Sequence, residues 1–241
     1  MKILIVAATQ QEIAPLFELD GPETEVDALV DDVLASAGAI SSDLTSVQTS
    51  VLVTGVGMTA TAFALGRQLA LNQYDLAINL GICGAFDRGL ALGEVVEITT
   101  DIFAELGAQD DEDFISIDQL GFGESIYTAG ASIPQFMGSI EDHKPRLKQV
   151  TGITVNRVHG NERTISKTAD RLHPQVESME GAAFFYACKQ AGVPALQIRA
   201  VSNYVEKRNR EQWQIGLAIK NLNTFANNLL KHLEALPPAV S

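Results

Sequence analysis

The order of apolar and helical segments is the feature that most constrains the fold of this chain. Short runs rich in Ile, Val and Leu, typical of buried strands, alternate with longer segments of helical character. This alternation predicts an α/β fold, a three-layer αβα sandwich around a mainly parallel or mixed central sheet. We expect strands over residues 2–8, 47–54, 76–80, 94–100, 153–158 and 195–202, and helices over residues 10–17, 58–71, 162–170, from about 174 to 190, and 212–233. Alternation near residues 26–33 suggests hairpin strands, and residues 101–148 are rich in predicted loops.

Length and charge limit the class of protein. The 241 residues suffice for one domain with a large core, and we see no linker or internal repeat, so we expect a single domain over residues 1–241. The formal net charge is −13 at pH 7. A surface of that charge repels nucleic acid phosphates and anionic membranes, which argues against both as partners.

Cysteine and histidine usage predicts no metal and no other cofactor, because their spacing matches no set of metal ligands. Cys83 and Cys188 lie in apolar surroundings, which predicts buried, reduced thiols. The apolar N-terminus is too short for a secretory signal, and no apolar run is long enough to cross a bilayer. We therefore expect a cytoplasmic protein.

The stretch at residues 176–183 combines two carboxylates, Glu177 and Glu180, with the small residues that begin at Gly181. Pro174 precedes it, which predicts that both acids lie in the first turn of a buried helix. A carboxylate held there beside a gap left by small residues could bind a neutral polyhydroxyl ligand. Acids are also favoured in a first turn by the helix dipole alone, and both interpretations stay open at this point.

A glycine-rich turn at residues 55–60 has the Gly-x-Gly-x-x-Ala pattern of a dinucleotide fingerprint, and Asp75 follows where an acid for a ribose would be expected. The fingerprint normally belongs to the first strand of its fold, whereas this is a later one. The turn could equally be a tight connection, or could hold an anionic or ribose group on its N–H groups.

Polar residues near the carboxyl ends of two predicted strands, 2–8 and 195–202, are expected to share one cleft, because ligands of such sheets bind at the carboxyl ends of the strands. Glu12 is either a solvated first-turn acid or a carboxylate that deprotonates a water. Arg199 lies in an apolar strand and needs a carboxylate partner, for which we expect Glu12. Asn203 is either a turn residue or an amide that faces a planar base. With Glu180, these residues favour hydrolysis of a glycosidic type of bond.

Four segments together resemble the nucleoside phosphorylase and nucleosidase superfamily: 55–57, 79–84, 176–183 and 199–203. The general likeness is to methylthioadenosine/S-adenosylhomocysteine nucleosidases, and the combination is most similar to futalosine hydrolases. The resemblance implies the same fold, a homo-oligomer and a nucleoside substrate. The implied catalytic residues are Glu12, Arg199 and Asn203, and the implied substrate-binding residues are Glu180, Met179, Gly84 and Val158.

The resemblance also implies individual roles. Glu12 would activate water, Glu180 would bind the ribose hydroxyls, and Met179 would pack on the sugar. Asn203 stands where adenine nucleosidases have Asp; an amide can accept from a purine N7–H and donate to an oxygen at position 6. The implied reaction is therefore hydrolysis of futalosine, which releases hypoxanthine and dehypoxanthine futalosine in menaquinone biosynthesis. Ser178 interrupts the family's Val-Glu-Met-Glu pattern and leaves the role of Glu177 open.

The alternatives are a purine nucleoside phosphorylase, a non-catalytic nucleoside-binding module and a nicotinamide oxidoreductase. Water is favoured over phosphate because the carboxylate of Glu12 would repel a dianion, and Arg199 alone among the cations is evidently near. Candidates to hold the 5′ substituent of the nucleoside are Phe103, Phe122, Tyr204 and Arg208.

Overall fold

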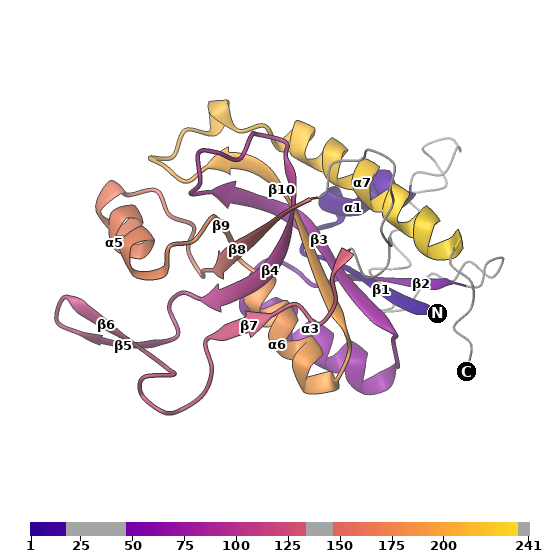
Figure 1. The fold of residues 1–241 in the computed structure, drawn as a ribbon, viewed down its shortest axis with the longest axis horizontal. Helices are drawn as coiled ribbons and strands as arrows, with labels where there is room; N and C mark the ends of the chain where they lie inside the picture. Colours follow the sequence, from indigo (N-terminus) through magenta and orange to yellow (C-terminus); the bar gives the residue numbers. More distant parts are fainter. Residues whose placement is uncertain (18–46, 134–146, 236–241) are drawn as a thin grey trace.

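A mixed sheet with helices on both faces forms the frame of the protein (Figure 1). The computed structural model describes residues 1–17, 47–133 and 147–235. The strands of the sheet are β1 (Lys2–Ala7), β2 (Gln48–Val53), β3 (Leu76–Ala85), β4 (Val95–Phe103), β7 (Ile126–Thr128), β8 (Lys148–Thr154), β9 (Val176–Ser178) and β10 (Ala195–Tyr204). The other elements are the helices α1 (Gln10–Phe17), α3 (Met58–Leu71), α5 (Glu162–Leu172), α6 (Gly181–Ala191) and α7 (Ile215–Ala235), the 3-10 turn Arg210–Gln212, and the hairpin of β5 (Gly107–Asp110) and β6 (Asp113–Ser116).

Part of the sheet closes on itself. β1 lies between β2 and β3 in parallel register, and β3 pairs in turn with β10 in parallel and with β9 in antiparallel register. β10 continues to β4, β4 to β8, and β8 to β9, so the five strands β3, β10, β4, β8 and β9 form a ring. β7 pairs with β4 outside this ring. Residues on the strands of the ring are thereby held at fixed positions relative to one another.

Two hydrophobic clusters hold the helices on the two faces of the sheet. In β1, Ile3 and Ile5 belong to the cluster that includes Leu222 and Leu229 of α7, whereas Leu4 belongs to the cluster on the side of α3 and α6. Alternation of side chains along a strand sends successive residues to opposite faces, and both faces of β1 are apolar because both are covered. The predicted three-layer αβα arrangement around a mixed sheet is confirmed.

Several element boundaries differ from the prediction, including the end of β3, where glycine was expected to end the strand. β3 continues through Gly81 and Gly84 to Ala85, and β8 ends at Thr154 instead of continuing to residue 158. Glycine inside a strand marks a close approach of other groups, and both glycines have such neighbours. Residues 101–148, expected to be mainly loops, contain β5, β6 and β7. The hairpin expected near residues 26–33 lies outside the described residues.

The stretch at residues 176–183 is a strand followed by a helix. Val176–Ser178 forms β9, which pairs with both β3 and β8, and α6 begins only at Gly181. The prediction that both carboxylates lie in the first turn of one helix is therefore wrong. Pairing on both sides within the ring outweighs the local helix signal, so Glu177 lies on a strand and Glu180 is the residue immediately before α6.

No helix within the described ranges is both long and apolar enough to span a membrane.

Candidate active site

Glu12 has a buried carboxylate whose two oxygens are both fixed. The side chain is 8% exposed. Oε2 accepts from the Thr9 backbone N–H at 2.9 Å and from the Thr9 hydroxyl at 3.0 Å. Oε1 accepts from the backbone N–H of Ile82, in β3, at 3.1 Å. A solvated first-turn acid has no such partners, so that alternative for Glu12 is wrong.

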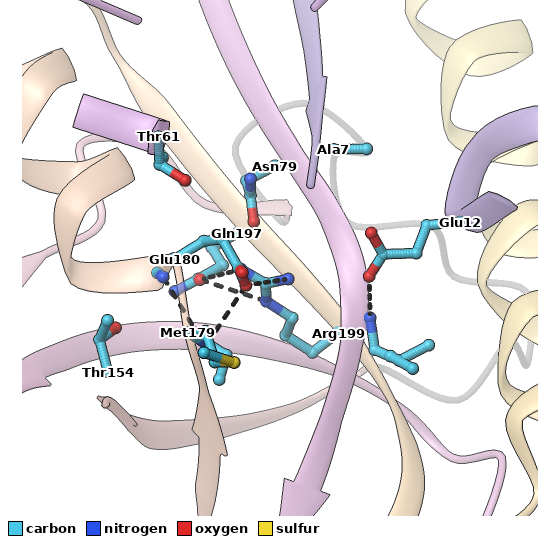
Figure 2. A network of polar contacts seen from close by, with 12 residues as sticks. Ala7, Glu12, Thr61, Asn79, Thr154, Met179, Glu180, Gln197 and Arg199 are labelled. Atoms are coloured by element: carbon cyan, nitrogen blue, oxygen red, sulfur yellow. Dashed lines mark hydrogen bonds and ion pairs between the residues drawn. The ribbon is translucent and has the colours of Figure 1, made fainter. Parts of the chain in front are cut away.

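Gly81 in β3 lies between Glu12 and Arg199. A Cβ built at Gly81 would lie 2.0 Å from Nη1 of Arg199 and 3.0 Å from Oε1 of Glu12. The guanidinium and the carboxylate therefore approach the same point of the β3 backbone, one from β10 and one from α1. Figure 2 shows Glu12 on one side of the β3 ribbon and Glu180 on the other.

Arg199 is 1% exposed, and its ion pair is with Glu180, with Nη1 3.9 Å from Oε2. Its Nε and Nη2 groups donate to Oε1 of Gln197 at 3.3 and 3.0 Å. The expected ion pair of Arg199 with Glu12 is wrong. Gln197 lies two residues before Arg199, on the same face of β10, and its hydrogen bonds direct the guanidinium toward α6. Nη1 has no hydrogen-bond partner among the described residues although it is fully buried, which leaves one donor available.

Glu180 occupies the N-cap position of α6 without capping it. Its Oε1 accepts from the backbone N–H of Gly57 at 3.0 Å, and its Oε2 accepts from the backbone N–H of Met179 at 3.2 Å (Figure 2). Glu180 is 5% exposed, and Met179, directly before it, is half-buried. The carboxylate is thus held between the α3 and α6 ends and next to Arg199.

The glycine-rich turn before α3 donates a hydrogen bond to the Glu180 carboxylate. Gly55 and Gly57 have φ values of +83° and +97°, which only glycine adopts readily, and the Gly57 N–H is donated to Glu180. Asp75, the acid of the dinucleotide pattern, accepts from the Lys2 N–H at the opposite end of β3. The two halves of that pattern do not meet, and the nicotinamide alternative loses its structural basis.

Asn203 and Gly84 lie side by side in a second part of the site. A Cβ at Gly84 would lie 3.2 Å from Nδ2 of Asn203 and 3.5 Å from Cγ of Glu177. The Asn203 Oδ1 accepts from the Ser202 hydroxyl at 2.8 Å, and Nδ2 donates to the Tyr204 carbonyl at 3.0 Å. An amide has two donor hydrogens and two acceptor lone pairs, so one of each is left for a ligand.

Glu177 fixes the loop between β8 and α5. Its Oε1 accepts from the His159 backbone N–H at 3.1 Å, and its Oε2 lies 2.6 Å from the His159 Nδ1. The other ring nitrogen of His159 lies 3.0 Å from the Thr168 hydroxyl. Val158, the residue before His159, is 37% exposed on this loop. Glu177 thus holds the backbone that presents Val158, a contact that the sequence does not reveal.

A buried polar chain behind Arg199 was missed by sequence reasoning. Gln197 Nε2 donates to Oδ2 of Asp101 at 2.9 Å, and the Thr154 hydroxyl donates to Oδ1 of Asp101 at 2.8 Å. Burial raises the pKa of Asp101 to about 6, although the hydrogen bonds from Gln197 and Thr154 and the charge of Arg199 oppose the shift. A second polar residue two positions before Arg199, in an apolar strand, was the available signal for Gln197.

The candidates for the 5′ substituent do not gather in one pocket. Phe103 and Phe122 line a cavity of about 630 Å³ beside α3 and α6, and Glu12, Glu180, Arg199 and Asn203 do not line it. Elsewhere, the Tyr204 hydroxyl donates to the Leu90 carbonyl at 3.0 Å, and the Arg208 guanidinium lies 5.2 Å from the Trp213 ring centre.

Within residues 1–17, 47–133 and 147–235, no three His, Cys, Asp or Glu side chains are grouped so that they could hold a metal ion.

Comparison with known proteins places this geometry in a family. The family model described as the phosphorylase superfamily matches residues 2–236. Futalosine hydrolase of Thermus thermophilus is 31% identical over 180 residues, which cover 74% of this chain and 80% of that protein. A methylthioadenosine/S-adenosylhomocysteine nucleosidase of Colwellia psychrerythraea, solved with adenine, superposes with a TM-score of 0.76 at 23% identity, covering 98% of this chain and 97% of that one. Futalosine hydrolase of Helicobacter pylori gives a TM-score of 0.75 at 13% identity, covering 97% and 98%. The chain therefore belongs to the phosphorylase superfamily and, within it, to the futalosine hydrolases.

Proposed function

We propose that this protein hydrolyses the N-glycosidic bond of futalosine, a 6-oxopurine nucleoside, and releases hypoxanthine and dehypoxanthine futalosine for menaquinone biosynthesis. The observation that carries the proposal is the meeting of Glu12 and Arg199 at Gly81, where a fixed carboxylate faces a buried guanidinium nitrogen that has no hydrogen-bond partner among the described residues. Sequence similarity to futalosine hydrolases supports the choice of nucleoside.

Glu12 acts as the general base in this proposal. A water bound between Glu12 and Nη1 of Arg199 gives a proton to Glu12, and its oxygen forms the new bond to the sugar C1′. The bond from C1′ to the purine nitrogen breaks, and its electron pair leaves with the base, which takes up a proton from solvent. The transition state is oxocarbenium-like, and the nearby carboxylates stabilise its positive charge.

Glu180 binds the ribose hydroxyls, and Met179 packs on the sugar. The lone pairs of Glu180 that are not used by Gly57 and Met179 are available as acceptors for the two hydroxyls. Glu180 is buried beside Arg199, and the guanidinium compensates the charge of this carboxylate and helps to hold it in place.

Asn203 selects the base. Its free acceptor site receives the N7–H of hypoxanthine, and its free donor hydrogen binds the oxygen at position 6. An adenine amino group would place a second donor against that hydrogen. Gly84, which has no side chain, lets the Asn203 amide approach the β3 backbone closely, and Val158 would contact the base from the loop held by Glu177.

Water is the nucleophile rather than phosphate. Among the described residues, Arg199 is the one cation in an ion pair with Glu180, and the Glu12 carboxylate faces the same position. A phosphate dianion placed there would be repelled by Glu12 more strongly than one guanidinium could compensate.

The test compares substrates with and without phosphate. Futalosine, inosine and methylthioadenosine are each incubated with the purified protein, and release of the base is followed. We expect fastest release from futalosine at a rate that phosphate does not change. Release that requires phosphate would assign a phosphorylase, and fastest release from methylthioadenosine would contradict the choice of base.

Replacing the general base separates catalysis from binding. In Glu12→Gln we expect futalosine to bind with nearly unchanged affinity while turnover falls by about 100-fold or more. Full turnover in this variant would show that Glu12 is not the general base. Absence of turnover in the wild type, with binding retained, would instead identify a nucleoside-binding module.

We further propose that the protein is a homo-oligomer that associates through an apolar face. This face is made of exposed apolar residues around α3, α6 and β7, together with the edge of the cavity beside them. Its most exposed members are Val56, Phe63, Leu71, Phe122, Ile126 and Tyr186. Large exposed apolar side chains on neighbouring elements are typical of a surface that contacts another protein.

We also propose a cytoplasmic location, supported by the two cysteines. Cys83 and Cys188 are both buried and form no disulfide, and burial raises the pKa of each thiol to about 12. Unpaired buried thiols are typical of a reducing compartment.

A further inference from the structure

Arg199 ends a buried chain of hydrogen bonds that begins at Asp101. The four side chains of this chain lie on three strands: Asp101 on β4, Thr154 on β8, and Gln197 and Arg199 on β10. Asp101 and Arg199 are 1% exposed, and Thr154 and Gln197 are fully buried. Water therefore does not compete for these bonds, and each bond depends on its neighbour.

The chemistry of the chain allows one orientation only. An ionised carboxylate accepts hydrogen bonds and donates none, so Asp101 binds the NH₂ group of Gln197. The amide oxygen of Gln197 then faces the guanidinium, which donates hydrogen bonds and accepts none. If the amide were turned over, NH₂ would face the donors of Arg199. Asp101 thus decides which atom Gln197 presents to Arg199.

The first residues of α6 pack against the hydrogen bond between Asp101 and Gln197. A Cβ at Gly181 would lie 2.0 Å from Oδ2 of Asp101 and 2.2 Å from Oε1 of Gln197. The next residue of α6, Ala182, donates its backbone N–H to the Thr154 hydroxyl at 2.7 Å. The helix therefore packs directly over the chain and holds Asp101 and Gln197 together.

We propose that Asp101 is a positioning residue for the hydrolysis, which acts through Gln197 to fix the plane of the Arg199 guanidinium. With Nε and Nη2 held by Gln197, the remaining nitrogen, Nη1, points between Glu12 and Glu180, where the attacking water binds. Figure 2 shows Gln197 and Thr154 on the same side of β3 as Glu180 and Arg199. The inference rests on the proposed function for its kinetic effect and on the hydrogen-bond chain for its structural effect.

The test first reverses the direction of the hydrogen bond between residues 101 and 197, and a second substitution then restores an acceptor facing Arg199. In Asp101→Asn, the new amide can present NH₂ to Gln197 and turn it over, so we expect kcat for futalosine to fall about 10- to 100-fold with KM close to that of the wild type. Adding Gln197→Glu gives a carboxylate that accepts both from the new amide at position 101 and from Arg199. In this double variant we expect most of the lost kcat to return.

The matched control lies on the same strand. Glu97 is also 1% exposed, and it accepts from the Gln149 amide at 3.2 Å and from the Ile133 N–H at 3.1 Å, without a bond to Arg199. Glu97→Gln removes the same kind of buried carboxylate, and we expect it to leave kcat unchanged. An equal loss of kcat in this control would reduce Asp101 to a structural role and overturn the proposal.

A second readout does not depend on turnover. In protein labelled with ¹⁵N-arginine, the Nε–H signal of Arg199, assigned by its loss in Arg199→Lys, should exchange slowly in the wild type and in the double variant, and faster in Asp101→Asn. If Asp101→Asn does not fold, Gln197→Met breaks the chain at its other link and should give the same loss of kcat and the same faster exchange. Unchanged kcat together with unchanged exchange in these variants would overturn the proposal. A wild type that releases no base would instead refute the proposed function, and the exchange experiment would still decide the role of Asp101.

Discussion

Each charged side chain of the site is held by backbone or side-chain groups before any ligand arrives. Glu12 and Glu180 both accept from backbone N–H groups, and Arg199 donates to an amide. Such fixed groups cost no reorganisation during the reaction, which is the basis of electrostatic catalysis. The sequence predicted Glu12, Glu180, Arg199 and Asn203 as polar residues next to apolar segments. It could not predict which partner each one takes, because partners come from strands far apart in the chain.

The amide of Asn203 should set the preference between bases. In Asn203→Asp, a carboxyl can accept from an amino group at position 6 or, when protonated, donate to N7. We expect kcat/KM for adenosine relative to inosine to rise about tenfold, since a mismatched buried polar contact costs roughly 1–3 kcal/mol. The two substrates differ only in the base. Asn209→Asp, in which the exposed side chain accepts from the Glu211 N–H, is the control and should leave the ratio unchanged. An unchanged ratio in Asn203→Asp would refute the role of this amide.

The buried carboxyl of Asp101 should make stability depend on pH. Its pKa of about 6 lies above the unfolded value of 3.8, so the folded protein binds more protons between these values, and stability falls as pH rises through that window. Relative to Asp101→Asn, the wild type should lose about 2 kcal/mol of unfolding free energy between pH 4.5 and pH 7.5. Urea titrations at the two pH values measure this difference.

Two ionisable groups near Asp101, Arg199 and Cys83, also bear on how stability depends on pH. Arg199 carries the opposing charge, and Cys83, whose pKa is raised to about 12 by burial, stays neutral over the whole window. A wild type that gains stability relative to Asp101→Asn as pH rises would show that the attraction to Arg199 outweighs burial.

At the scale of elements, α6 connects the sugar site to the buried chain. Glu180 lies at its N-cap position, and Gly181 and Ala182 contact Asp101, Gln197 and Thr154. The sequence predicted most helices and strands correctly because their apolar periodicity is local. It misassigned β9 and the end of β3, since a three-residue strand and a glycine-containing strand are stabilised by pairing across the ring and not by their own residues.

Two glycines in helices should respond in opposite ways to alanine. In Gly181→Ala, the new Cβ overlaps Asp101 and Gln197, and we expect a loss of about 1–3 kcal/mol in unfolding free energy. In Gly66→Ala, on α3, the new Cβ meets nothing within 4 Å, and we expect a gain of about 0.5–1 kcal/mol. Urea denaturation of both variants gives the comparison. Equal stability of the two would show that α6 tolerates a side chain over the polar chain.

At the scale of the whole molecule, the two covered faces of the sheet differ in their outer surfaces. α3 carries large exposed apolar residues, with Phe63 and Leu71 each 73% exposed. A cavity lined by Met58, Phe122 and Tyr186 lies next to these residues. Figure 1 shows α3, α6 and β7 as neighbouring elements. This outer apolar face was not predicted from sequence, because its residues come from segments that lie far apart in the chain.

Association should depend on this face. Phe63→Glu should shift the sedimentation equilibrium of the protein from an oligomer toward the monomer, because a buried unpaired carboxylate opposes the contact. Leu217→Glu places the same change on α7, where Leu217 is 42% exposed, and should leave the oligomer intact. A monomeric wild type, or an unchanged Phe63→Glu variant, would contradict the proposed interface.

The close approach of Arg199 to Gly81 limits which residues position 81 can hold. Every other residue type adds a Cβ, whose place is set by the backbone, and at this position it would lie 2.0 Å from the guanidinium of Arg199. No choice of rotamer removes that overlap. We therefore expect lineages that keep Arg199 in this position to keep glycine at position 81, whereas Gly66 and Gly216, where a Cβ meets nothing within 4 Å, should tolerate substitution.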